Sequence, residues 1–175
     1  DDILEKLHSD SARLTYLKVL YTPGNTEVAD RILSLDPRDY TLLEREIKYA
    51  KQKNLTNRIL GLGRKLIDLH MKNGVNSATL DTVIGLRHKG LADYTIDRLI
   101  EETPNEHSME YAAEIANAFG ESTREKIILN ELLKVQKKKS EFLFTAADTA
   151  VKLGKYNEAV NLYMKNAKSS FGFLD

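Results

Sequence analysis

Two stretches in the last third of the chain repeat without a gap, and this repeat constrains the fold more than any other feature. Each stretch ends in a glycine, and Gly154 follows Gly120 by 34 residues. The small-residue runs AAEIA (112–116) and AADTA (146–150) stand at the same distance before these glycines. A period of this length is typical of stacked helical hairpins and predicts an all-α repeat fold.

Apolar residues recur every three or four positions along nearly the whole chain, which predicts helices rather than strands. Turn signals divide this pattern into about five antiparallel helix pairs, whose first helices begin near residues 2, 38, 76, 106 and 140. The first of these helices is expected to carry Leu4 through Leu17, and Gly90 is expected to be the turn of the third pair. The run Ser122–Glu125 fits a capping box. A single compact bundle is the rival architecture, but it does not explain the repeat.

We expect residues 1–175 to form one helical-repeat domain, a fragment of a longer array. Terminal repeats of such arrays need a polar cap, whereas Phe171, Phe173 and Leu174 suggest an unfinished interface.

The last predicted hairpin resembles a tetratricopeptide repeat. The matching positions are Leu143, Ala146, Ala147, Ala150, Gly154, Tyr156, Ala159 and Tyr163. The preceding hairpin matches at Met109, Ala112, Ala113, Ala116, Gly120 and Leu129, so the resemblance covers about residues 106–170. Asn166, Ser122 and Glu125 depart from the family pattern. The resemblance implies a right-handed superhelix (a solenoid) whose concave groove is lined by first helices. Generic helical hairpins of trafficking coats are the nearest alternative.

The resemblance also implies which residues face a ligand, because such positions alternate with the packed alanines. Carried onto this sequence, they are His107, Glu110, Glu114, Asn117, Glu141, Phe144, Asp148 and Val151. From these we predict a peptide-binding set of Glu110, Glu114, Asn117, Glu141, Phe144 and Asp148, in which four carboxylates surround Phe144. Family members that bind chaperone C-termini use Lys and Asn here, so acids disfavour that partner class. An acidic groove with one aromatic anchor favours a basic or amphipathic segment. The alternative is a merely solvated helix face.

Bulk composition excludes several functional classes. Equal numbers of basic and acidic residues (26 each) offer no general attraction to nucleic acid or anionic membranes. Without cysteine, the chain has no disulfide and no thiolate metal site, which suits a reducing cytoplasm. The acidic start Asp1-Asp2 does not resemble a signal peptide, and no apolar run is long enough to span a membrane. We therefore expect a cytoplasmic location.

The remaining motifs favour no catalytic or cofactor site. Lys134 and Lys137–Lys139 form the densest basic cluster, yet lack interleaved aromatics. The run Gly61–Lys65 has the wrong spacing and context for a phosphate loop. None of the four histidines is paired at the i, i+4 spacing of a helical metal site.

We therefore predict a protein–protein interaction scaffold, with no enzymatic activity, metal or cofactor, and with self-association through terminal repeats as a further possibility. A structural segment of a larger assembly is the alternative, and an RNA-binding helical repeat is the third choice.

Overall fold

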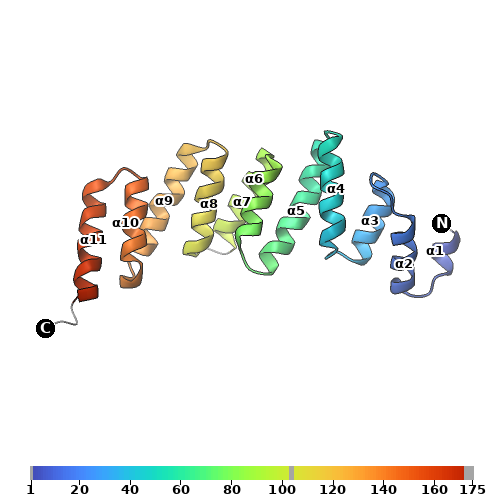
Figure 1. Ribbon diagram of the computed structural model, residues 1–175, viewed down its shortest axis with the longest axis horizontal. Coiled ribbons are helices and arrows are strands. Elements are labelled where there is room, and N and C mark those ends of the chain that lie inside the picture. Colours follow the sequence, from blue (N-terminus) through green and yellow to red (C-terminus); the bar gives the residue numbers. More distant parts are fainter. Residues whose placement is uncertain (1, 103–104, 172–175) are drawn as a thin grey trace. The chain divides into compact units, whose positions relative to one another are not determined.

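A computed structural model describes residues 2–102 and 105–171 of the chain, and these residues form helices and connecting turns without any β-strand. The all-α class and the packing of helices that follow one another are therefore as predicted. Figure 1 labels the helices along the chain. The chain divides into two compact units, Asp1–Thr82 and Val83–Asp175, and each is described by itself.

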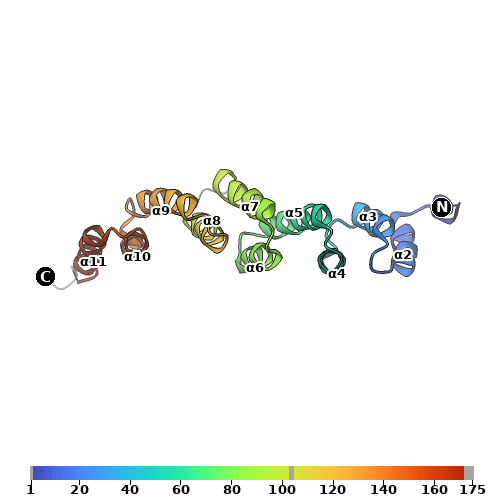
Figure 2. The same cartoon turned by 90° about the horizontal axis from the view of Figure 1, so that it is seen from above.

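The first unit is a succession of helices in which each packs against the next, from α2 to α5. Its helices are α1 (Asp2–Lys6), α2 (Asp10–Leu20), α3 (Thr26–Leu35), α4 (Tyr40–Gln52), α5 (Thr56–Lys72) and the first part of α6 (Ser77–Leu86). Seen from above, α2 and α4 lie in one layer of this unit and α3 and α5 in the other (Figure 2).

The second unit continues in the same way. It contains α7 (Lys89–Glu101), α8 (Glu106–Ala118), α9 (Ser122–Gln136), the 3₁₀ turn η1 (Ser140–Phe142), α10 (Leu143–Lys152) and α11 (Tyr156–Phe171). Each helix from α7 to α11 packs against the next one. The repeated alanines 146, 147 and 150 are fully buried on α10, where they pack with Leu133, Ala159 and Leu162. Small side chains let the helix backbones approach closely, as the repeat pattern predicts.

A left-handed residue precedes each of the five helices α3, α5, α7, α9 and α11 by two positions. These residues, all with positive φ, are Gly24, Asn54, Arg87, Gly120 and Gly154. Their successive spacings are 30, 33, 33 and 34 residues, so the period seen in the last two hairpins extends toward the N-terminus. Two of the five residues are not glycines, which is why the sequence pattern did not reveal them.

Three of these turns share one hydrogen-bond pattern. The amide that follows the left-handed residue donates to a carbonyl five residues earlier: Leu55 to Ala50, Glu121 to Ala116 and Lys155 to Ala150, at 2.8–2.9 Å. This is the Schellman closure, which satisfies the free carbonyls of a helix end while it reverses the chain. The alanine that accepts the bond is fully buried each time, so the turn and the packing of the first helix depend on the same residue.

Several predicted boundaries were wrong. The expected first helix is two helices, because Ser9 caps α2 through its side chain, which accepts from the Ala12 amide at 3.2 Å. Gly90 lies inside α7, and Arg87 makes the turn. The capping box at Ser122 does not form, since the N-cap residue is Glu121 and its side chain makes no cap bond.

Two other sequence features fall outside the described residues: the break at Thr103-Pro104, and Phe173 with Leu174 of the suggested terminal interface.

Glycine substitutions test the turns. Gly120→Ala should destabilise the protein by about 1 kcal/mol, because an L-residue is strained in the left-handed region. Arg87→Gly should stabilise it by up to about 1 kcal/mol by removing the same strain. Gly61→Ala, inside α5 where a Cβ would meet nothing within 4 Å, should stabilise by about 0.5–1 kcal/mol. Urea unfolding measures all three, and equal effects of the two Gly→Ala changes would contradict the assigned turns.

Candidate functional site

A groove with a volume of about 610 Å³ opens in the second unit, between α8, α9 and α10. Its lining residues are Glu110, Ala113, Glu114, Asn117, Glu125, Leu129, Leu132, Thr149 and Lys152. The N-terminus of α8 is set by Asn105, whose side chain accepts from the Ser108 amide at 2.9 Å. The groove has the size of a pocket that holds a few side chains of a ligand.

The charges that line the groove are mostly negative. Glu110 and Glu114 belong to α8 and Glu125 to α9, whereas Lys152 of α10 is the one cation among the lining residues. Buried Leu129 and Leu132 of α9 and Ala113 of α8 form its apolar part. Carboxylates beside an apolar floor can hold the charged head and the aliphatic stem of a basic side chain together.

A buried polar chain supports one wall of the groove. Gln136 of α9 is 1% exposed, and its Nε2 donates to Glu110 Oε1 at 3.5 Å. The hydroxyl of Thr149 on α10 donates to Gln136 Oε1 at 2.8 Å. These contacts connect three helices and orient Glu110, since a buried amide must use its hydrogen-bonding groups.

The structure separates the six predicted site residues into two groups. Glu110, Glu114 and Asn117 line the groove together. Glu141, Phe144 and Asp148 are also exposed, but they are not among its lining residues.

Phe144 and Asp148 instead lie against α11. The ring of Phe144 packs edge-on against Tyr163 at 5.5 Å between centroids. The Tyr163 hydroxyl donates to Asp148, and this bond raises the pKa of the tyrosine. The predicted aromatic anchor therefore contacts α11, and it is not among the residues that line the groove with Glu110 and Glu114.

Sequence reasoning missed Glu125, Thr149 and Lys152 of the groove. It carried the ligand-facing positions of α8 onto α10 by the 34-residue period, which selects Phe144 and Asp148. Lys152 follows Asp148 by four positions and so lies on the same side of α10, but the α10 residues that line the groove are Thr149 and Lys152. The spacing of three between these two residues places them on one helical face, which was the signal available in the sequence.

In each unit an ion pair connects a helix to the next helix but one. The two paired residues occupy the same positions of their helices in both units. Arg58 is the third residue of α5 and pairs with Asp30, the fifth residue of α3, at 3.1 Å. Arg124 is the third residue of α9 and pairs with Asp93, the fifth residue of α7, at 2.7 Å. We call this arrangement the 3–5 contact. One such contact is present in each unit, and no sequence pattern indicated it.

The basic cluster is largely neutralised by neighbouring acids. Lys134 pairs with Glu131, Lys137 with Glu158 and Lys139 with Glu106. The hydrogen bond from Lys137 lowers the pKa of Glu158. Cations held by carboxylates have less charge to offer to a phosphate backbone.

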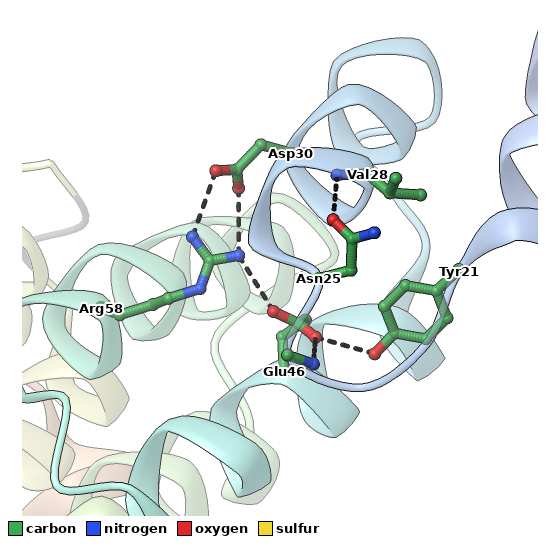
Figure 3. A network of polar contacts seen from close by, with 7 residues as sticks. Tyr21, Asn25, Val28, Asp30, Glu46 and Arg58 are labelled. Atoms are coloured by element: carbon green, nitrogen blue, oxygen red, sulfur yellow. Dashed lines mark hydrogen bonds and ion pairs between the residues drawn. The ribbon is translucent and has the colours of Figure 1, made fainter.

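A second polar site is buried in the first unit (Figure 3). Glu46 of α4 is 0% exposed. It accepts hydrogen bonds from the Tyr21 hydroxyl at 2.8 Å, from Arg58 at 3.0 Å and from the Gly24 amide at 3.4 Å. Burial and the bond to Glu46 raise the pKa of Tyr21.

The buried carboxylate is bound by groups of the protein itself, because Tyr21, Gly24 and Arg58 all donate to it. Arg58 extends the network to Asp30 on α3, so the site joins α3, α4, α5 and the turn after α2. Its chemistry is that of a structural connection between successive helices.

Removing this carboxylate tests that role. Glu46→Ala should destabilise the first unit by about 3 kcal/mol, because it leaves Arg58 and Tyr21 without their buried partner. Asp30→Asn, on the exposed side of the same arginine, should cost less than about 1 kcal/mol. Hydrogen exchange of residues 21–58 followed by mass spectrometry measures both. Equal losses of protection would contradict the assigned importance of Glu46.

Two features are absent from residues 2–102 and 105–171. No three His, Asp or Glu residues converge there as a metal site would require. No helix in that part of the chain combines the length and apolar character needed to cross a bilayer.

Comparison with known proteins assigns no family. No protein-family model matches the chain, and no curated protein has a matching sequence.

Proposed function

We propose that this chain is a protein–protein interaction scaffold that binds a basic or amphipathic segment of a partner protein in the groove between α8, α9 and α10. The observation that carries the proposal is the meeting of Glu110, Glu114 and Glu125 from two helices above the apolar Ala113, Leu129 and Leu132.

Charge complementarity defines the partner. A lysine or arginine side chain can lay its methylene groups on the leucines while its charged head reaches the glutamates. Lys152 stands at the α10 border of the groove and repels a second cation there. The preferred ligand therefore has its basic residues opposite α8 and α9. A partner that offers a C-terminal carboxylate is disfavoured by the same acids.

The recurring turns support the wider architecture that we propose, a right-handed tetratricopeptide-like superhelix of about five helix pairs. Left-handed residues recur at 33–34-residue spacing over four turns, close to the 34-residue period of that repeat. In such an array the first helices line a concave surface, and α8 and α10 are first helices of their pairs. A scaffold of this kind needs no catalytic group or cofactor, and we assign it to the cytoplasm.

One observation favours a second candidate, a structural segment of a larger assembly. The last helix, α11, exposes a stripe of large apolar side chains, and exposed apolar surface of this kind marks interaction sites. A nucleic-acid-binding repeat has weaker support, because three of its four candidate lysines are held by carboxylates.

A series of charge changes tests the groove. Peptide arrays of basic amphipathic segments provide a ligand, whose affinity for the purified protein is then measured by fluorescence anisotropy. Glu114→Lys should weaken binding at least about tenfold by turning attraction into repulsion, and Lys152→Glu should strengthen it. Asp148→Lys makes the same charge change at an exposed α10 residue that is not among the lining residues, so it is the matched control, with a smaller expected effect.

Three outcomes would count against the groove. Equal weakening by Glu114→Lys and Asp148→Lys would indicate attraction to net charge alone, and no effect of Glu114→Lys would exclude the site. Weaker binding to Lys152→Glu would contradict the assigned polarity. Circular dichroism of each variant checks that the helices are intact.

A further inference from the structure

Gln136 of α9 is a large polar side chain that the fold buries, with an exposed fraction of 1%. Its amide gave up water on folding, a free-energy cost that its hydrogen bonds must offset. One of its two partners is Glu110, whose side chain is 48% exposed and lines the groove. A leucine at position 136 would fill similar space without that cost. The amide therefore has its distinct effect on the carboxylate that it contacts.

Two neighbours fix the orientation of this amide. An ionised carboxylate only accepts hydrogen bonds, so the amide nitrogen must face Glu110, where Nε2 lies 3.5 Å from Oε1. The amide oxygen then faces the Thr149 hydroxyl at 2.8 Å. The second oxygen of Glu110, Oε2, lies 4.0 Å from His107 Nδ1. This distance is longer than a hydrogen bond, so Oε2 remains open to a donor from a ligand.

Glu114 provides a second carboxylate next to the oriented one. It follows Glu110 by four positions on α8, which places both on one helical face, and both line the groove. A guanidinium is a planar fork that donates from several N–H groups in fixed directions, so it gains from acceptors in fixed positions. An ammonium is a compact point charge and gains less from the same placement. An oriented carboxylate thus favours arginine.

We propose that the groove selects arginine over lysine in its partner segment, and that Gln136 is the positioning residue that sets this preference through Glu110. The inference rests on the proposed function, because it names the basic side chain that the same groove binds. The guanidinium donates to Glu110 Oε2 and to Glu114, while its methylene groups lie on the apolar part of the groove. Gln136 is not among the lining residues and acts through Glu110.

Two peptides of one sequence test the preference. The tightest basic peptide from the array is synthesised with arginine at every basic position and again with lysine at every one, so that net charge is equal. Fluorescence anisotropy measures both affinities for the whole chain. The arginine form should bind about tenfold more tightly, which corresponds to one additional charge-assisted hydrogen bond.

Two variants test the role of Gln136. Gln136→Leu should reduce the preference for arginine to about twofold or less, because Glu110 is no longer oriented. The Thr149 hydroxyl keeps the Thr145 carbonyl as an acceptor at 3.0 Å, so this change leaves no buried donor unpaired. Thr149→Val releases the amide from its other side and should lower the preference in the same direction.

Two control variants accompany them. Thr95→Val makes the same change at a buried threonine of α7 that does not line the groove, and it should keep the preference for arginine. Glu125→Gln removes a charge from the groove on α9 and should weaken both peptides by a similar factor, which leaves the preference intact. Circular dichroism checks the helix content of each variant.

Each contrary result has a distinct meaning. Equal affinities of the two peptides for the wild-type chain overturn the arginine preference, and the proposed function stands if Glu114→Lys still weakens both. A preference that survives both Gln136→Leu and Thr149→Val overturns the role of Gln136. Loss of the preference in Thr95→Val attributes it to general loosening of the unit and contradicts a positioned carboxylate. Absence of binding by either peptide overturns the inference together with the proposed function.

Discussion

Burial of a small residue at the ends of the first helices α4, α8 and α10 is the contact on which the architecture depends. Ala50, Ala116 and Ala150 are fully buried, and the carbonyl of each closes the left-handed turn that follows. Because one residue serves both packing and turn closure, the two helices of a pair are positioned by a local interaction. This explains how the turns can remain regular while the surfaces between hairpins vary.

Those variable surfaces carry the candidate functions. Between the α8–α9 hairpin and α10, acidic side chains border an open groove. Ion pairs join α3 to α5 and α7 to α9. On α11 the fifth residue, which is Asp30 on α3 and Asp93 on α7, is the exposed Val160. One backbone repeat therefore presents three kinds of surface chemistry, as is expected where each repeat contacts only its neighbours.

Sequence patterns predicted the helices better than the site. Periodicity of three to four and two aligned glycines were sufficient for the all-α class, because both arise from local backbone preferences. The same reasoning placed a turn at Gly90 and overlooked Arg87, since an exposed arginine in the left-handed region has no sequence signature, unlike a glycine. It grouped Phe144 with Glu110, whereas in the structure Phe144 contacts Tyr163 of α11 and Glu110 lines the groove.

The sequence by itself determined the helical period, the buried alanine positions and the acidity of the first-helix faces. Each follows from residues a few positions apart on one helix. Only the tertiary structure decided that Glu125 and Lys152 join Glu110 at one groove, that Glu46 is buried under Tyr21 and Arg58, and that Phe144 lies against Tyr163. These contacts join different helices, and their geometry depends on how the helices pack, which no spacing along the chain specifies.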